Sequence, residues 1–418
     1  MAFTYDIFCK LYPAGVKVAA LFNPKARLWV QGRKHIFQKL EATVGQNTQP
    51  LLWMHCASLG EFEMGRPVLE AFRKQYPNYK ILLTFFSPSG YEIRKNYNGT
   101  DYVFYLPNDS RENAERFMKI VKPSLAIFVK YEFWHYYLQT LKTNNIKLLL
   151  ISAVFRQDQL FFKKHGEFFK NDLKCFTHFF VQNQASLDLL DSIGITNATL
   201  SGDTRFDRVV EIAHTWQPIP LIEQFSQDKQ VFVAGSTWQE DENSFAPFVN
   251  THPEIKTIIA PHDISEERIN DCLKKFPTAI RFSQYSNAPE TADNIKANTL
   301  IIDNIGMLNK LYRYATVTYV GGAWGTKGIH NILEAAVFGK PVLYGPNYSK
   351  NYEAQELVDA GGAFSYSEPE KISEHLAHLF SDKTALEKAS AAARDFVQKN
   401  MGATEVIMNK VNGMWLEA

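Results

Sequence analysis

From residue 50 onward, the chain alternates short apolar runs with longer amphipathic stretches. The runs have the length of buried strands, and the stretches between them repeat apolar residues at helical spacing, as Val68, Leu69 and Phe72 do. This alternation is typical of a doubly wound α/β fold built on a parallel sheet. In the first half, strands are predicted at residues 51–55, 80–85, 124–129, 147–151, 176–181 and 198–201.

Near residues 207–222 the pattern loosens into a proline-containing linker, Trp216 to Pro220, and then resumes. Strands of a second sheet are predicted at 231–234, 257–260, 299–302 and 317–320. We therefore predict two Rossmann-like domains, at 41–214 and 215–418, preceded by a separate N-terminal segment at 1–40.

The loops that follow these strands carry the candidate chemistry, because parallel strands present their carboxyl ends at one edge of a sheet. A loop at 56–65 is predicted after the first strand, followed by a helix from about Arg66 with Pro67 in its first turn. Another loop, Ser87 to Gly90, follows the second strand.

A glycine-rich stretch at 318–346 organises the second half. It predicts a strand, a loop with four glycines, a helix at 330–338 ended by Gly339, and a second strand. Asn331 and Glu334 are three residues apart, so they share one helix face at the end where anions bind. A carboxylate there suits a ribose diol, and an amide suits a base or a phosphate.

Composition limits the possible functions. Of the 418 residues 45% are hydrophobic, which predicts folded cores, and a net charge of +1 gives no support for nucleic acid as a partner. The four cysteines lie far apart without metal-ligand spacing, which indicates a reducing compartment and neither disulfides nor structural zinc.

Residues 1–40 are locally basic, with seven lysines and arginines against the single carboxylate of Asp6. Aromatic and aliphatic residues lie between these charges, among them Phe8, Leu21, Phe22 and Trp29. Such a mixture fits a segment on an anionic membrane surface, and the alternative is an ordinary amphipathic helix packed on the first domain. No apolar run approaches the ~20 residues of a spanning helix.

Glu61 is the sharpest catalytic candidate. It lies beside Gly60 in the loop after the first strand, where a carboxylate within reach of a hydroxyl can serve as a general base. Taken alone, a loop glutamate is more often a solvated surface residue. Glu63, two positions on, is a second carboxylate that we do not expect to be the base.

The motifs HxxSxGE at 55–61, VGG at 320–322, GxHNxLE at 328–334 and GKPVLYGP at 339–346 follow in order. Together they resemble the 3-deoxy-D-manno-octulosonic acid (Kdo) transferases, which are GT-B glycosyltransferases. The resemblance implies two Rossmann-like domains, with a last helix that crosses back to the first. It implies that Glu61 is the catalytic base, and that Glu132 and Arg205 also act in catalysis.

Three positions depart from the family pattern. His262 stands where the family has arginine, Met307 stands where it has glutamate, and Lys130 replaces the first carboxylate of an ExE motif. By resemblance, the donor contacts are predicted at Pro261, His262, Ile305, Gly306, Met307, Gly328, Asn331, Ile332, Leu333 and Glu334. The acceptor side is predicted at Ser58, Gly60, Ser87 and Ser89.

The expected activity is therefore inverting transfer of Kdo from CMP-Kdo to the lipid A precursor, lipid IVA. The resemblance implies the cytoplasmic face of the bacterial inner membrane as its location, with no cofactor and no metal. Two alternatives remain open from the residues: a GT-B enzyme that uses another nucleotide sugar, and an inactive GT-B relative that binds lipid.

Overall fold

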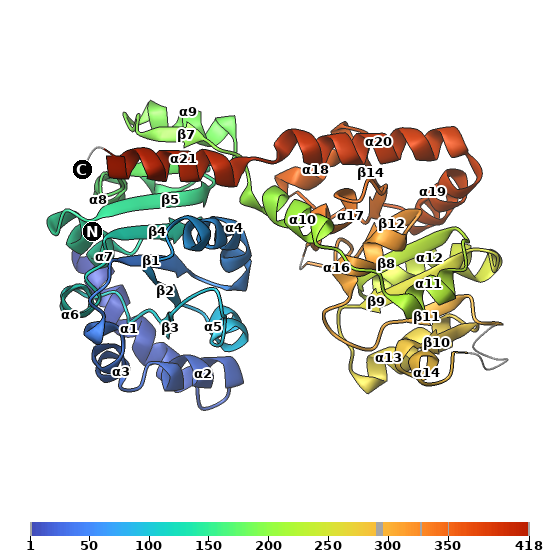
Figure 1. The fold of residues 1–418 in the computed structure, drawn as a ribbon, viewed down its shortest axis with the longest axis horizontal. Helices are drawn as coiled ribbons and strands as arrows, with labels where there is room; N and C mark the ends of the chain where they lie inside the picture. The colour runs from blue at the N-terminus through green and yellow to red at the C-terminus, as the bar shows by residue number, and fades with distance from the viewer. Residues whose placement is uncertain (1, 290–295, 327, 350, 417–418) are drawn as a thin grey trace. The chain divides into compact units, whose positions relative to one another are not determined.

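The computed structural model describes residues 2–289, 296–326, 328–349 and 351–416 (Figure 1). The chain forms two compact units. The first consists of Met1–Arg208 together with Met401–Ala418, and the second of Val209–Asn400. Each unit contains a parallel seven-stranded sheet, as the alternation of strand and helix patterns predicts.

In the first unit, the sheet has the order β3-β2-β1-β4-β5-β6-β7. Its strands span Leu51–Cys56 (β1), Lys80–Phe85 (β2), Tyr102–Tyr105 (β3), Leu125–Val129 (β4), Lys147–Ala153 (β5), His178–Val181 (β6) and Ala198–Leu200 (β7). The helices span Ala2–Ala19 (α1), Pro24–Gly32 (α2), Ile36–Ala42 (α3), Leu59–Gln75 (α4), Pro88–Arg94 (α5), Arg111–Val121 (α6), His135–Thr143 (α7), Glu167–Leu173 (α8), Gln184–Ser192 (α9), Thr204–His214 (α10, which runs into the second unit) and Ala403–Leu416 (α21).

Both faces of this sheet are buried, which explains why its central strands are continuous apolar runs. Along β1, Leu51 and Trp53 belong to one hydrophobic core, whereas Leu52, Met54 and Cys56 belong to the core on the opposite face. Successive side chains of a strand point to opposite faces, so one six-residue strand contributes to two cores.

Helix α4 begins at Leu59, seven residues before the predicted start at Arg66, so the predicted loop at 56–65 is mostly helical. Pro67 lies inside the helix rather than in its first turn. The earlier start buries Phe62 and Gly65 against the sheet, where a Cβ on Gly65 would lie 2.9 Å from a methyl group of Val129. Close helix–sheet packing therefore outweighs the cost of an internal proline.

In the second unit, the sheet has the order β10-β11-β9-β8-β12-β13-β14. Its strands span Val231–Thr237 (β8), Lys256–Pro261 (β9), Ala279–Arg281 (β10), Thr299–Ile301 (β11), Val317–Val320 (β12), Val342–Tyr344 (β13) and Ala363–Ser365 (β14). Helices span Pro220–Ser226 (α11), Gln239–Thr251 (α12), Glu266–Lys275 (α13), Phe282–Asn287 (α14), Leu308–Leu311 (α16), Leu333–Ala336 (α17), Tyr352–Asp359 (α18), Pro369–Ser381 (α19) and Lys383–Asn400 (α20).

The last helix belongs to the first unit, although the sequence predicts 215–418 for the second domain. Ile407, Met408 and Val411 of α21 are buried in the core that α4 covers, and the two helices pack side by side (Figure 1). Asp207 fixes the start of α21, because its carboxylate accepts hydrogen bonds from the backbone N–H groups of Gly402 and Thr404, both at 2.6 Å. The predicted segment at 1–40 is likewise part of the first unit.

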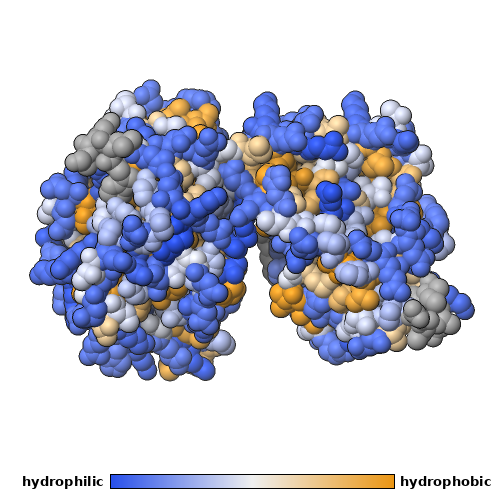
Figure 2. Space-filling model, in the orientation of Figure 1, coloured by the Kyte–Doolittle hydropathy of each residue, from blue (hydrophilic) through white to orange (hydrophobic). Residues whose placement is uncertain are grey.

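The surface in Figure 2 is mostly hydrophilic over the first unit, with hydrophobic residues scattered between. Apolar side chains are nevertheless exposed along α1, the turn after it and α2. Of the helices in the described part of the chain, none has both the length and the apolar character needed to cross a membrane. The exposed apolar side chains of this region are Ile7, Phe8, Leu11, Tyr12, Val18, Leu21, Phe22 and Leu28.

Candidate functional site

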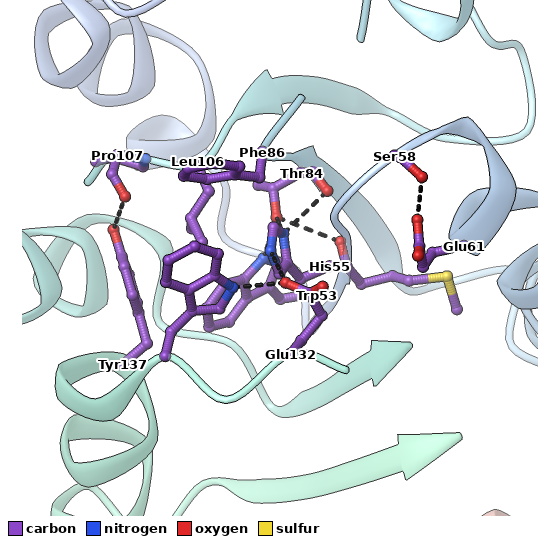
Figure 3. A network of polar contacts seen from close by, with 12 residues as sticks. Trp53, His55, Ser58, Glu61, Thr84, Phe86, Leu106, Pro107, Glu132 and Tyr137 are labelled. Atoms are coloured by element: carbon purple, nitrogen blue, oxygen red, sulfur yellow. Dashed lines mark hydrogen bonds and ion pairs between the residues drawn. The ribbon is translucent and has the colours of Figure 1, made fainter. Parts of the chain in front are cut away.

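Glu61 lies in the first turn of α4, directly beyond the carboxyl end of β1. Ser58 has the extended backbone of an N-cap, and its carbonyl accepts the first helical hydrogen bond from the N–H of Phe62 at 3.1 Å. The Ser58 hydroxyl donates to the carboxylate of Glu61, which is half-buried (Figure 3). The first turn of α4 therefore presents the Glu61 carboxylate directly beyond the carboxyl end of β1.

Glu63 has a different environment. Its carboxylate accepts a hydrogen bond from Arg94 at 2.7 Å and lies 3.9 Å from a guanidinium nitrogen of Arg66. Two cations therefore hold this carboxylate, whereas the Glu61 carboxylate receives a neutral hydroxyl. The geometry is consistent with the predicted choice of Glu61 over Glu63, and the catalytic role of Glu61 stays a prediction.

Glu132 is buried at the end of a polar chain that starts inside the sheet (Figure 3). The indole of Trp53 donates to the hydroxyl of Thr84 at 2.8 Å, and this hydroxyl lies 2.9 Å from Nδ1 of His55. Nε2 of His55 lies 2.9 Å from Glu132, which also accepts from the indole of Trp134 at 2.5 Å. Nδ1 of His55 also lies 3.1 Å from the carbonyl oxygen of Thr84, so the ring is held from both sides.

The motif residue His55 thus has a role that the sequence did not reveal: it positions Glu132. The Cys56 thiol is buried next to His55 at the end of β1. Burial first, and then the charges of Glu61, Glu132 and Glu63, hold the pKa of Cys56 well above its ordinary value. The structure therefore gathers the predicted catalytic glutamates around the carboxyl end of β1.

The predicted acceptor-side residues lie at the same edge of the sheet. The N–H of Ser87 donates to the carbonyl of Ala57 at 2.7 Å, which joins the turn after β2 to the turn after β1. Ser87 caps α5, and its hydroxyl lies 3.0 Å from that of Ser89. Gly60 is exposed at the start of α4, next to Ser58. The edge therefore presents several hydroxyl groups beside Glu61.

Arg205 lies in the first turn of α10 and donates to the carboxylate of Asp203 through Nε at 2.8 Å and a terminal nitrogen at 2.6 Å. Thr204 anchors this turn, since its hydroxyl donates to the carbonyl of Met64 in α4 at 2.5 Å and lies 2.8 Å from the hydroxyl of Ser152. The helix that carries Arg205 is therefore fixed to the helix that carries Glu61. Part of the Arg205 charge is already matched by Asp203.

In the second unit, the predicted glycine-rich loop follows β12 and is held by a residue that the sequence analysis missed. Asp241, in the first turn of α12, is buried and accepts hydrogen bonds from the N–H groups of Trp238 at 2.8 Å and Gly322 at 2.9 Å and from the hydroxyl of Tyr319 at 2.9 Å. Burial raises its pKa to about 6, although these donors oppose the shift. The sequence signal that could have identified Asp241 is its position as the third residue of a helix, where acidic side chains commonly cap the backbone.

The helix predicted at 330–338 is shorter in the structure, where α17 covers only Leu333–Ala336. The Asn331 side chain accepts from the N–H of Leu333 at 3.2 Å, and this local bond starts the helix two residues beyond Asn331. A one-turn helix does not supply the predicted anion site at its N-terminus. Asn331 and Glu334 still lie together, at 3.1 Å, and Gly339 has the expected positive φ of 64°.

The side chains of Ile332 and Leu333 are buried in the core, so only their backbone could face a donor. Gly328 has a φ of 82°, and Lys327, in the same predicted loop, lies outside the described residues. Pro261 is buried at the end of β9.

The imidazole of His262 stacks between two other rings at the carboxyl edge of the sheet. Its centroid lies 4.6 Å from that of Trp238 and 4.6 Å from that of His330. His262, which departs from the family pattern, therefore contacts Trp238, the residue that precedes α12. In the turn after β11, Gly306 has a φ of 96°, Ile305 is 86% exposed and Met307 precedes α16.

Comparison with known proteins agrees with the motifs. Residues 32–208 match the family model described as 3-deoxy-D-manno-octulosonic-acid transferase (kdotransferase). The chain is 27% identical to the 3-deoxy-D-manno-octulosonic acid transferase of Rickettsia felis over 373 residues, which is 86% of this chain and 78% of that protein. It is 26% identical to the transferase of the same name from Aquifex aeolicus over 344 residues, 81% of this chain and 88% of that protein.

Solved structures show the same fold. UDP-GlcNAc 2-epimerase from Neisseria meningitidis bound to UDP-GlcNAc has a TM-score of 0.62 at 16% identity, covering 87% of this chain and 100% of that chain. Acinetobacter baumannii MurG has a TM-score of 0.55 at 14% identity, covering 87% and 99%. The resemblance to the Kdo transferases is therefore confirmed, and the chain is a glycosyltransferase with the GT-B fold.

Proposed function

We propose that this glycosyltransferase acts in lipopolysaccharide biosynthesis, where it transfers Kdo from CMP-Kdo to a lipid A precursor such as lipid IVA. In this proposal the acceptor hydroxyl loses its proton to Glu61 as its oxygen attacks the anomeric carbon of Kdo. The bond from that carbon to the phosphate oxygen breaks, CMP leaves, and the anomeric configuration inverts. The products are the Kdo-bearing lipid and CMP, with the proton on Glu61.

The observation that carries the proposal is the arrangement at the carboxyl end of β1. Glu61 lies in a helical first turn with the Ser58 hydroxyl on its carboxylate, and the buried Glu132 is held by His55 nearby. A half-buried carboxylate beside exposed hydroxyl-bearing turns suits a base that removes a proton from a sugar hydroxyl.

For the donor, we assign the nucleotide to the residues that lie at the carboxyl edge of the second sheet. The paired Asn331 and Glu334 offer amide and carboxylate groups to the ribose and base, and the backbone of the turn at Gly306 offers hydrogen bonds to cytosine. His262 supplies a titratable side chain at a position where the family pattern has arginine. No cofactor and no metal ion enter the proposed reaction.

We further propose that the first unit adsorbs to an anionic membrane through α1 and α2. The exposed apolar side chains of this region, together with its lysines and arginines, suit an interface where apolar groups enter the lipid and cations face head groups. In this proposal the enzyme acts at the cytoplasmic face of the inner membrane, on an acceptor lipid held in that membrane.

The direct test is mass spectrometry of the lipid made from CMP-Kdo and a purified lipid A precursor, which should gain at least one Kdo. Glu61→Gln should lower the rate about 10²- to 10⁴-fold. Glu63→Gln is the matched control, because Glu63 is bound by arginines. Transfer at the wild-type rate by Glu61→Gln would exclude Glu61 as the base.

A second measurement tests the donor. CMP should protect the second unit against thermal unfolding better than UDP does at equal concentration. Stronger protection by UDP would favour a transferase for another nucleotide sugar, and an absence of any transfer product would favour a lipid-binding role.

A further inference from the structure

A small apolar pocket lies between α1 and the polar edge of the first sheet. Its volume is about 140 Å³, and its wall includes Phe8, Cys9 and Tyr12 from α1 together with Phe86 and Trp134. The aromatic rings contact one another across it: Tyr12 and Phe86 at 5.9 Å between centroids, and Phe86 and Trp134 at 4.7 Å. The rings form an apolar cleft rather than a filled core.

The two sides of this pocket differ in their surroundings. Phe8 is 55% exposed and belongs to the apolar surface of α1, so it marks the side open to a membrane. Trp134 donates its indole N–H to the buried carboxylate of Glu132, and Phe86 directly precedes Ser87. The pocket therefore connects the exposed face of α1 with the edge that carries the candidate catalytic groups.

Two polar groups in the wall limit what the pocket can hold. Oδ1 of Asn108 is buried, and within the described part of the chain it has no hydrogen-bond donor. A ligand reaches this oxygen once the Asn108 side chain turns toward the pocket, where it can accept from a hydroxyl or an amide N–H. Asp109, also in the wall, already accepts from Tyr5, Tyr136 and Tyr137. Its negative charge disfavours a ligand carboxylate such as that of a free fatty acid.

We propose that this pocket binds the first methylenes of one amide-linked or hydroxylated acyl chain of the acceptor lipid. The chain enters past Phe8, its amide N–H or hydroxyl donates to Asn108, and its sugar head group then lies at the edge formed by Ser87 and Glu132. The inference rests on the proposed lipid acceptor. It adds that acceptor choice depends on a built acyl site as well as on adsorption of α1 to a surface.

Cys9 provides a native reporter of occupancy, since it lines the pocket and is partly exposed, whereas Cys56, Cys175 and Cys272 are buried. Burial raises the pKa of the Cys9 thiol to about 11, so alkylation by N-ethylmaleimide is run at a fixed alkaline pH and followed by intact-protein mass spectrometry. The probes are monomeric N-acylglucosamines of increasing chain length, glucosamine itself, and the matching free fatty acids.

The expected result is protection of Cys9 by the N-acylglucosamines. Affinity should rise about fourfold for each added methylene until the pocket is full, and then level off. Glucosamine and the free fatty acids should protect at least tenfold less. The proposal would be overturned if a free fatty acid protected Cys9 equally well, if glucosamine protected it, or if no probe did. It would also be overturned if alkylation slowed with rising protein concentration alone, because a second copy of the chain would then cover the pocket.

A variant pair separates the pocket from the surface. Cys9→Trp fills the pocket and should weaken calorimetric binding of N-octanoylglucosamine at least tenfold, whereas Val18→Ser on the exposed face of α1 should weaken adsorption to anionic vesicles and retain that binding. Equal loss of N-octanoylglucosamine binding in both variants would overturn the proposed acyl site. Kdo transfer without Cys9 protection would refute only this inference, and protection without transfer would refute only the proposed function.

Discussion

The buried carboxyl group of Asp241 makes the stability of the second unit depend on pH. Its pKa is raised from 3.8 to about 6, mainly by burial. The folded unit therefore binds this proton more tightly than the unfolded chain does. The stabilisation is fully present below about pH 4 and is lost as pH rises through about 6. A shift of about two units corresponds to about 3 kcal/mol.

Asp241→Asn keeps an acceptor for the N–H groups of Trp238 and Gly322 while it removes the charge. We expect the free energy of unfolding of wild type, relative to that of this variant, to fall by up to about 3 kcal/mol between pH 4 and 7. Asp241→Ala leaves both N–H groups without that acceptor, which should cost about 1–3 kcal/mol for each.

Urea unfolding of each variant, followed by circular dichroism at several pH values, measures these changes. The difference between wild type and Asp241→Asn isolates this carboxyl, because the other acids are common to both proteins. Asp109→Asn is the matched control in the first unit, since burial raises the pKa of Asp109 to about 6 as well. Parallel curves for wild type and Asp241→Asn would refute the reasoning.

Two further substitutions test the supports of the site. Asp207→Ala removes the acceptor for the first N–H groups of α21. Urea unfolding should show that the first unit is destabilised by about 0.5–2 kcal/mol. An effect confined to the second unit would contradict the placement of α21. Gly322→Ala should raise the KM for the donor with little loss of first-unit stability. Gly322 has a φ of 97°, and a Cβ added there would lie 2.5 Å from the carbonyl oxygen of Gly328. An unchanged KM would show that the loop does not shape the donor site.

The sequence predicted the central strands well and three edge strands not at all. Buried strands such as β1 and β8 are apolar on both faces, which makes them visible as runs. By contrast β3, β10 and β14 are edge strands with partly exposed residues, so their sequences resemble loops. These edge strands form because they pair with neighbouring strands, and the local sequence pattern does not reveal that pairing.

The strand before each motif was predicted correctly, but the contacts that hold the motif residues were not. The position of Glu61 after β1 followed from the pattern, whereas the early start of α4 depended on packing against the sheet. The chain from Trp53 to Glu132 links residues about eighty positions apart, and only the fold brings them into contact. Asp241 was overlooked because an acidic residue in a first helical turn is common and its burial is invisible in the sequence.

The placement of α21 has a consequence for biosynthesis of the chain. The first unit is translated first, yet part of its core is made of Ile407, Met408 and Val411, which leave the ribosome after the whole second unit. The hydrophobic surface of α4 that these residues cover must therefore wait, exposed or protected by chaperones, until synthesis is nearly complete. A protein truncated after residue 400 would therefore have an incompletely packed first unit, although the truncation lies at the C-terminal end.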